Sequence, residues 1–156
     1  KQAYHSLFKT DGSLETISIL SAQIFFECGR GKECYNNNLG NIKKTKNHQW
    51  TWFSCSEYIK GVNTHFHPPH PQTHFNAYIS LPCAAQEHLQ FLNGERYHKA
   101  LEEAQKGNVI DYCTELKRAG YFTDTIEHYT KVMVSIFNEI KDKYYYEIEE
   151  DPYEQK

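Results

Sequence analysis

The sequence predicts an α+β fold, mainly helical with a small β element. Apolar residues recur at three- and four-residue steps near the N-terminus and through most of the chain after Pro82, as they do in amphipathic helices. Between these regions, residues 49–53 alternate polar and aromatic side chains of the types favoured in strands. At 156 residues, the chain fits a single domain over residues 1–156 with one substantial core.

The first predicted helix spans residues 13–29. Ser13 can cap its start, and Gly29, just past the last turn, can end it. Its apolar stripe contains Ile17, Leu20 and Ile24. This stripe marks the side of the helix that is expected to face the core.

Glu27 continues this stripe, since it falls three residues after Ile24 and seven after Leu20. Its carboxyl is therefore expected to face the core or a cleft. Removal from water disfavours the ionised form of a carboxyl and raises its pKa, which suits a general acid that works near neutral pH. The alternative is a buried acid with a structural partner, because structural ion pairs also place acids at helix ends.

A loop and a strand region follow the first helix. Residues 33–43 are rich in Asn and Gly and lack a period, which favours a structured loop or a short hairpin. Residues 48–53 are predicted to be extended, and the segment up to Ile59 can form part of a small sheet. Residues 65–71 are predicted to be a loop, because their prolines remove hydrogen-bond donors and restrict their neighbours.

Four further helices are expected to supply most of the core. They span 84–92, 97–105, 109–119 and 126–140. Asn108 can cap the third of them, and Gly120 can end it. Asp124 can cap the fourth, with Glu127 completing a capping box. Residues 141–156 either extend the last helix or fray.

Composition argues against nucleic acid and membranes as partners. The net charge is −3 with His neutral and the pI is about 6.3, so no basic field favours anionic polymers or lipids. The mean hydropathy is −0.75, and no apolar run approaches the ~20 residues that span a bilayer. We therefore expect a soluble monomer without membrane insertion. Aromatic residues make up 15% of the chain; their rings suit sugars, although packing explains most single rings.

The five cysteines bear on the cellular compartment. They lie at positions 28, 34, 55, 83 and 113. This density fits an oxidising compartment, whereas the alternative is a set of reduced thiols in a cytosolic protein; spacing alone does not give the pairing. The chain begins at Lys1 without a Met or a signal segment, so we expect the mature or trimmed form of a secreted or periplasmic protein.

Four motifs follow one another in an order typical of one enzyme family. They are Glu27 with Gly29, Gly31 and Lys32; Asn37-Asn38-Leu39-Gly40-Asn41-Ile42-Lys43; Phe75-Asn76-Ala77-Tyr78; and Gly120-Tyr121-Phe122-Thr123-Asp124. Over residues 13–140 the chain resembles the glucosaminidase-type branch of the lysozyme superfamily, which includes autolysin-like endo-β-N-acetylglucosaminidases. The resemblance implies a lysozyme-like domain that cleaves β-1,4 bonds in the glycan strands of peptidoglycan without a cofactor.

The resemblance also implies a role for each motif. Glu27 would be the general acid that protonates the leaving glycosidic oxygen. Tyr121 would line the site, where its phenol stabilises developing charge or orients the sugar; the alternative is a packed Tyr at the start of the last helix. Asn38 and Asn41 would form the cleft floor and hydrogen-bond the glycan, although turn formation explains them equally well. The aromatic segment adds two substrate-binding residues, Phe75 and Tyr78.

Glycoside hydrolysis usually needs a second carboxylate as base or nucleophile. Glu57, in the β region, is the best-placed one, and its alternative is a solvated surface Glu. Glu33 lies near Glu27 in sequence, and Asp124 is better explained as a cap. Without a second acid, a substrate-assisted or lytic transglycosylase route remains open.

Several departures from the family pattern indicate a cysteine-bearing subgroup. Cys28 and Arg30 flank the first Gly of the motif, and Cys34 and Cys55 bracket the loop. The chain is similar to secreted proteobacterial members with a Pro-Pro-x-Pro-Gln-Thr-His-Phe segment, including lysozymes of predatory bacteria that act on N-deacetylated peptidoglycan. That similarity implies a cationic glucosamine substrate, which an acidic or neutral cleft would favour, and a Cys34–Cys55 disulfide.

A second signal is a run of histidines around three prolines. It comprises His65, His67, His70 and His74. Imidazoles this dense can bind zinc, but a proline loop lacks the frame of structural zinc sites, so we expect no metal. We expect His70 and its neighbours to border the cleft, with binding that depends on pH between about 5 and 8. A non-catalytic glycan-binding module and a His-rich metal binder stay open as alternatives.

Overall fold

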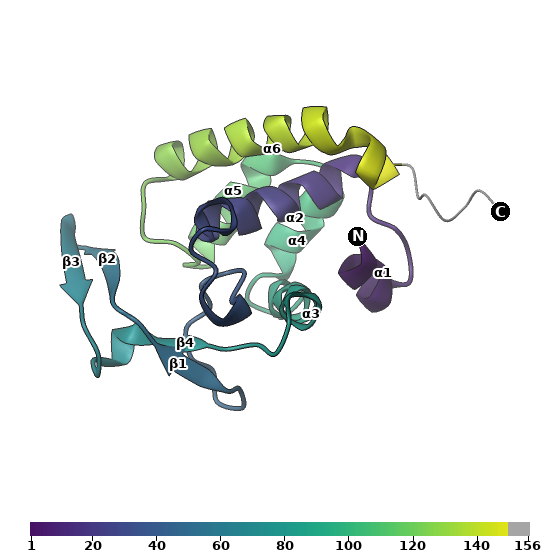
Figure 1. Ribbon diagram of the computed structural model, residues 1–156. Helices are drawn as coiled ribbons and strands as arrows, with labels where there is room; N and C mark the ends of the chain where they lie inside the picture. The colour runs from purple at the N-terminus through teal and green to yellow at the C-terminus, as the bar shows by residue number, and fades with distance from the viewer. Residues whose placement is uncertain (150–156) are drawn as a thin grey trace.

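The computed structural model describes residues 1–149 as a helical part from which a β arm (residues 50–76) projects (Figure 1). The helices are α1 (Gln2–Phe8), α2 (Leu14–Glu27), α3 (Leu81–Leu92), α4 (His98–Gln105), α5 (Val109–Arg118) and α6 (Ile126–Glu149). The strands are β1 (Trp50–Trp52), β2 (Cys55–Ile59), β3 (Val62–Phe66) and β4 (His74–Asn76). Short 3-10 turns are η1 (Gly29–Gly31), η2 (Tyr35–Asn37) and η3 (Pro71–Thr73). The prediction of a mainly helical α+β fold is confirmed.

The helical part is built around α2. This helix lies along α6 and also contacts α4, while α5 packs on α4 and α6, and α1 packs on α3 (Figure 1). One cluster of buried side chains draws on all six helices and includes Tyr4, Ile19, Leu89, Leu101, Tyr112 and Met133. Each large apolar side chain buried there stabilises the fold by about 1.5–3 kcal/mol. The core therefore fixes the position of α2, the helix that carries Glu27.

A polar network lies inside this core. Gln23 of α2 is fully buried, and its Oε1 accepts hydrogen bonds from the Tyr112 hydroxyl and from His88 Nε2, the latter at 3.2 Å. Burial lowers the pKa of His88 to about 4 because the imidazolium is disfavoured away from water. The ring is therefore neutral at pH 7, and with Nε2 donating, its Nδ1 carries no proton.

The ends of α2 follow local chemistry. The helix starts as predicted after Ser13, whose Oγ accepts from the backbone N–H of Thr16 at 3.1 Å. It is stopped by Gly29 as predicted, because residues 29–31 all adopt positive φ angles that cannot continue a right-handed helix. Glu27 is therefore the last helical residue.

The caps of the later helices match the sequence in one case and differ in another. Asn108 caps α5 as predicted, accepting from a backbone N–H of the first turn. At α6 the predicted cap, Asp124, is wrong, because Thr125 Oγ1 accepts from the backbone N–H of His128 at 3.3 Å. Asp124 instead binds the His128 side chain at 2.5 Å.

Three other helix boundaries differ from the prediction. Helix α3 begins at Leu81 rather than at 84, because Ser80 caps it and Pro82 is accommodated in the first turn. Helix α1 was not predicted, since its seven residues have no side-chain cap at the start. Helix α6 continues through 141–149, so the helical alternative holds there, and residues 150–156 lie outside the described part of the chain.

The β arm, as described, contains two separate two-stranded antiparallel sheets. Strand β1 pairs with β4, which aligns Thr51 with Phe75, and β2 pairs with β3, which aligns Glu57 with Thr64. The predicted strand region over 48–59 is confirmed by β1 and β2. Strand β4 was not predicted, because it follows directly after the proline loop and is only three residues long.

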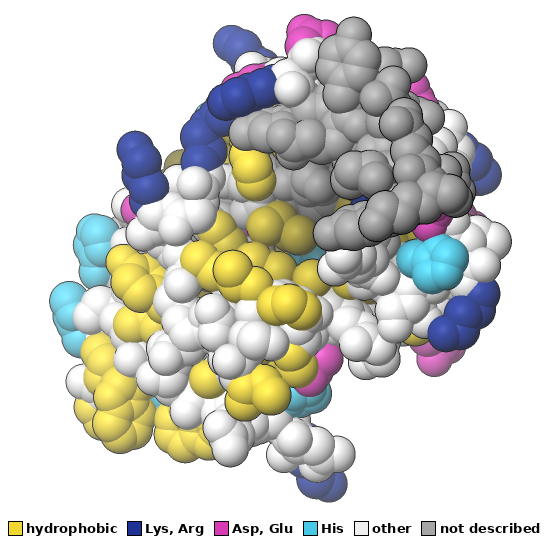
Figure 2. Space-filling model, turned by 45° about the vertical axis from the view of Figure 1, so that its right-hand side comes forward, with side chains coloured by type: hydrophobic (Ala, Val, Ile, Leu, Met, Phe, Trp, Pro, Cys, Tyr) yellow, Lys and Arg dark blue, Asp and Glu magenta, His cyan; other side chains and the backbone are white. Residues whose placement is uncertain are grey.

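Exposed hydrophobic side chains gather on the β arm. They include Trp50, Trp52, Tyr58, Ile59 and Val62. In Figure 2, hydrophobic side chains are exposed over the lower left of the visible face, while Lys and Arg lie mostly towards its edges. No helix within residues 1–149 has both the length and the apolar character needed to cross a bilayer.

The expected Cys34–Cys55 disulfide is not present in the structure, in which all five cysteines are free. The backbone N–H of Glu33 donates to the carbonyl of Cys28 at 3.0 Å. Cys34, the next residue, therefore lies near the end of α2. Cys55 instead lies on β2, where its thiol donates to the carbonyl of Gln72 at 3.3 Å.

Candidate active site

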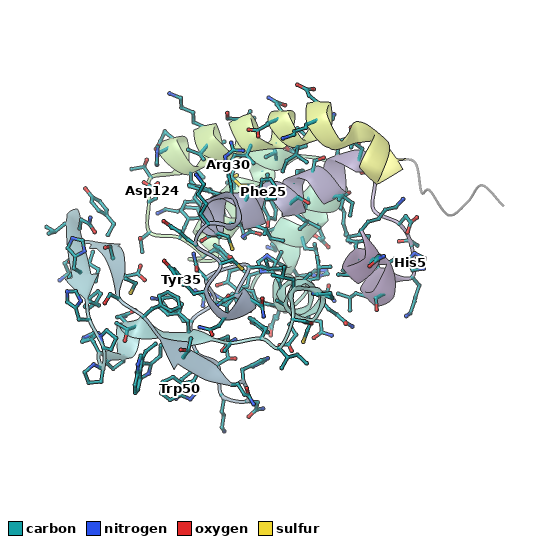
Figure 3. All side chains as sticks on the ribbon, in the orientation of Figure 1. His5, Phe25, Arg30, Tyr35, Trp50 and Asp124 are labelled. Atoms are coloured by element: carbon teal, nitrogen blue, oxygen red, sulfur yellow. The ribbon has the colours of Figure 1, made fainter. Side chains whose placement is uncertain are left out.

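A cleft of about 970 Å³ lies between the helical part and the β arm. Its lining comes mainly from the end of α2, residues 40–45, residues 53–57 and residues 120–124. Figure 3 shows two lining residues, Tyr35 and Asp124, on the side of the helices that faces β2 and β3. The cleft brings together five residues that the sequence proposed for the site: Glu27, Asn41, Glu57, Phe75 and Tyr121.

Glu27 stands at the end of α2 with its carboxyl in the cleft lining. Burial raises the pKa of this carboxyl to about 7, and the charge of Glu57 adds to the rise. Hydrogen bonds from Tyr129 and Asn41 oppose it, because they favour the ionised form. The carboxyl is therefore partly protonated near pH 7, so it can both give and take a proton near neutrality.

Tyr129, on α6, is a residue of the site that the sequence analysis did not single out. Its hydroxyl donates to Glu27 Oε1 at 3.2 Å, and its ring stacks on Phe122 at 3.7 Å between centroids. The signal was present in the sequence. Tyr129 lies on the apolar stripe of α6, four residues before Met133 and seven before Ile136, as Glu27 lies on the stripe of α2.

Removal of the Tyr129 hydroxyl should raise the pKa of Glu27 further. In Tyr129→Phe the carboxylate loses a donor that favours its charge, so the pKa should rise above 7 by roughly half a unit to one unit. The alkaline limb of the pH–activity profile should then move to higher pH. Tyr35→Phe is the matched control, since Tyr35 lines the cleft but is not among the groups that shift Glu27. An alkaline limb that stays in place or moves down would contradict the assignment.

Tyr121 lines the cleft beside Glu27 and holds the adjacent loop. Its hydroxyl donates to the carbonyl of Gly40 at 3.0 Å, and its ring meets Phe91 and Tyr97 edge to face. Burial and the nearby charge of Glu27 raise the pKa of Tyr121 well above its usual value. The phenol therefore stays protonated and can act only as a neutral donor or acceptor at physiological pH.

Gly40 is needed where the loop passes the core. A Cβ at this position would lie 2.5 Å from His88 Nδ1 and 3.0 Å from the Tyr121 hydroxyl. Because His88 is fully buried, its ring has little room to move.

Gly40→Ala should destabilise the fold by about 1–3 kcal/mol through this overpacking. It should also lower activity, because Asn41, which follows Gly40 and lines the cleft, would be displaced with the loop. Urea unfolding monitored by circular dichroism gives the free-energy change. A loss smaller than about 0.5 kcal/mol would show that the ring of His88 can move aside and that the loop does not depend on glycine.

Glu57 brings a second carboxylate to the cleft. It lies on β2, and its Oε1 is 2.7 Å from Lys43 Nζ. Lys43 also lies over the ring of Phe75, 4.0 Å from its centroid. The charge of Glu57 is among the causes that raise the pKa of Glu27, so the two carboxyls interact across the same cleft.

The other two acids considered also line the cleft. Asp124 accepts hydrogen bonds from His128 and from the backbone N–H of Thr125, and these bonds lower its pKa. Glu33 approaches the end of α2, where its side chain would meet a Cβ at Gly29 at 3.4 Å. Asp124 is therefore held as an ionised structural acid, which leaves Glu57 as the better-placed partner of Glu27.

Asn41 and Phe75 form part of the cleft floor. The Asn41 amide donates to the backbone carbonyl of Glu27 at 2.5 Å, and Asn41 adopts a positive φ of 47°, which Asn tolerates better than most residues. Phe75 stacks on Phe53 at 4.1 Å with an interplanar angle of 9°. Both rings line the cleft and offer an aromatic surface to a ligand.

Three residues proposed for substrate binding do not line the cleft. Asn38 is fully buried, and its side chain bonds the backbone of Ile42 at 2.9 Å and of Asn76 at 3.0 Å. Tyr78 is almost buried and accepts from the Asn76 amide at 3.3 Å. His70 is exposed, stacks on Phe66 and accepts from the backbone of η3. The structure therefore gives Asn38 the turn-forming role that the sequence had left as its alternative.

The four histidines of the proline loop have separate partners. His65 bonds Ser56 at 2.7 Å and His67 bonds Ser54 at 3.0 Å. His74 lies against Trp50, with ring centroids 4.5 Å apart. Within residues 1–149, no three His, Cys, Asp or Glu side chains come together in a way that could hold a metal ion, so these histidines give no support to a zinc site.

Neither family models nor curated protein sequences match this chain, but solved structures do. A crystal structure of a peptidoglycan hydrolase mutant from Sphingomonas sp. A1 is 26% identical with a TM-score of 0.65, and the match covers 80% of this chain and 84% of that one. Two structures of the glycoside hydrolase domain of Salmonella typhimurium FlgJ, one truncated at its C-terminus, are 21% and 19% identical. Their TM-scores are 0.55 and 0.54, and the matches cover 80% of this chain and 83% and 74% of those chains. The chain therefore has a lysozyme-like α+β fold of the kind found in glycoside hydrolase domains.

Proposed function

We propose that the protein is a glycoside hydrolase that cleaves β-1,4 bonds in the glycan strands of peptidoglycan, with Glu27 as general acid. The observation that carries the proposal is a cleft-lining carboxyl whose pKa is about 7. A carboxyl with its usual pKa would be almost fully ionised at neutral pH and would have no proton to give. The likeness to a Sphingomonas peptidoglycan hydrolase supports the same activity and substrate.

The reaction follows from the groups in the cleft. Glu27 gives its proton to the glycosidic oxygen as the bond to the sugar breaks, and positive charge develops on the ring. Glu57, paired with Lys43 and interacting with Glu27 across the cleft, stabilises this charge or activates water. Tyr121 contributes a neutral phenol, and the stacked rings of Phe53 and Phe75 support the sugar plane.

The lytic transglycosylase reaction is the second candidate. It would use Glu27 first as acid and then as base, and a pKa near 7 suits both uses. Its product would be an anhydro sugar instead of a reducing end. A glycan-binding module without catalysis would use the same cleft but would release no product.

N-deacetylated strands are the substrate variant that we propose to test first. The cleft carries Glu33, Glu57 and Asp124 besides Glu27, and its cations are Lys43, Lys44 and Arg96. Lys43 is paired with Glu57, and Glu33 and Asp124 balance Lys44 and Arg96. The cleft is therefore close to neutral and repels a glucosamine ammonium less than a basic cleft would. We propose that the protein acts outside the cytoplasm, since its proposed substrate lies in the cell wall. We also propose that it acts as a monomer.

Mass spectrometry of soluble products from native and chemically N-deacetylated peptidoglycan tests the proposal. Muropeptides with reducing ends would establish hydrolysis, and anhydro ends would establish the transglycosylase reaction. Faster release from deacetylated strands would support the selectivity. If neither substrate yields soluble products while sedimentation with the insoluble wall shows binding, the chain is a binding module and the enzymatic proposal fails.

A further inference from the structure

Two thiols meet at the end of the helix that carries Glu27. Cys28 follows Glu27 directly and is 1% exposed, whereas Cys34 is half-buried. The Cys28 thiol donates to the backbone carbonyls of Asn38 and Leu39 at 3.5 and 3.1 Å, and the Cys34 thiol is near enough to contribute to the raised pKa of Cys28. The backbone bond from Glu33 N–H to the Cys28 carbonyl, at 3.0 Å, closes the loop between them and keeps the two cysteines together.

We infer that Cys28 and Cys34 form a disulfide that closes the loop between α2 and η2 when the protein meets a low-molecular-weight disulfide oxidant. The loop of residues 28–34 is short, and its ends already lie together in the reduced fold. A cross-link there requires the Cys28 thiol to leave the carbonyls of Asn38 and Leu39 while the backbone bond from Glu33 keeps the ends of the loop in place, in contrast to the Cys34–Cys55 pairing that the family resemblance implied.

The reduced loop has weak restraints. Residues 29–31 all have positive φ angles, a conformation that costs free energy at the non-glycine residue Arg30. Figure 3 shows Arg30 beside α6, and its guanidinium binds Glu139 with two bonds of 2.6 and 2.7 Å. This ion pair is exposed, with about half of the Arg30 side chain open to solvent, so it restrains the loop only modestly. A covalent link would add a restraint that water and salt do not weaken.

The oxidation proceeds in two thiol–disulfide exchange steps. The thiolate of Cys34, the accessible partner, attacks one sulfur of glutathione disulfide and releases one glutathione thiolate. The thiolate of Cys28 then attacks the Cys34 sulfur of this mixed disulfide and releases the second glutathione. Two protein thiols lose two protons and two electrons, and the oxidant is reduced to two thiols.

Burial sets the pace of the second step. It raises the pKa of the Cys28 thiol to about 12, because the thiolate is disfavoured away from water and beside other acids. The mixed disulfide on Cys34 should therefore form first, and ring closure should accelerate as the pH rises towards 9.

The test uses the full chain in glutathione buffers, followed by intact-mass measurement and tryptic mapping without reduction. Trypsin cuts after Arg30 and Lys32, so Cys28 and Cys34 fall on separate peptides, 10–30 and 33–43. We expect a loss of about two mass units, a link between these two peptides, and an apparent melting temperature roughly 5–10 °C above that of the reduced protein.

Matched variants separate this pairing from others. Cys34→Ser should lose both the link and the melting shift, whereas Cys55→Ser and Cys83→Ser should keep them. A link from 33–43 to 47–60, the peptide that carries Cys55, would overturn the inference. A stable glutathione adduct on Cys34 with Cys28 still free at pH 9 would overturn it too. Neither readout depends on the proposed enzymatic activity.

Discussion

Glu27→Gln is expected to release muropeptides about 10²–10⁴-fold more slowly than the wild type, because the amide has no proton to give to the leaving oxygen. The Tyr129 hydroxyl can still donate to the Gln oxygen, so the geometry of the cleft should persist. Binding to the insoluble wall, measured by sedimentation, should stay close to that of the wild type. The rate of product release by mass spectrometry gives the activity.

The same substitution should stabilise the protein at alkaline pH. The pKa of Glu27 is raised in the fold to about 7, against 4.5 for the free group, so the folded state loses stability as the pH rises from about 4.5 to 7 and the unfolded chain ionises first. Gln does not ionise, so the variant does not lose stability in this pH range. The variant should therefore match the wild type near pH 4 and exceed it by up to about 3 kcal/mol at pH 8.

Glu33→Gln is the control for both effects. Glu33 lines the same cleft and undergoes the same chemical change, but it has no assigned part in proton transfer. Its activity should stay within a few-fold of the wild type, and its stability should not gain at pH 8. If Glu27→Gln retained activity within about tenfold, or if Glu33→Gln lost as much activity, Glu27 would not be the acid.

Glu57→Gln is expected to produce the second large loss, about 10²-fold or more in product release, because the developing positive charge loses its carboxylate partner. A second signature follows from the interaction between the two acids. Since the charge of Glu57 raises the pKa of Glu27, its removal should lower that pKa and move the alkaline limb of the pH–rate profile to lower pH.

These two signatures distinguish a catalytic carboxylate from a structural one. The ion pair with Lys43 lies at the surface of the cleft and stabilises the β arm only slightly, so Glu57→Gln should leave the melting temperature nearly unchanged. Product release within twofold of the wild type would mean that the second group is not Glu57. The reaction would then rely on the substrate or on Glu27 alone.

The elements that the sequence predicted best are those whose reason is local. The stripe of α2, its cap at Ser13 and the cap of α5 at Asn108 depend on residues close in the chain, and the structure contains all three. The position of Glu27 on that stripe also led directly to the cleft. Local periodicity therefore carried information about function as well as about structure.

The errors at Asn38 and Tyr78 have a different origin, since they depend on contacts between distant segments. Asn38 is buried because it bonds the backbone of Asn76 across the loop, a partner that spacing does not reveal. Tyr78 turns away from the cleft to meet the same Asn76. No local pattern distinguishes these partners from the ones that were expected.

Direct titration of the Glu27 carboxyl tests the central claim, that this residue holds a proton at neutral pH. Protein labelled with ¹³C at the side-chain carboxyl of Glu is followed by NMR between pH 3 and 9, and Glu27→Gln assigns the signal by its absence. We expect a carboxyl signal that titrates near pH 7. A Glu27 signal that titrates near the ordinary value of 4.5 would show that the residue is ionised at neutral pH, and the assignment of Glu27 as general acid would be wrong.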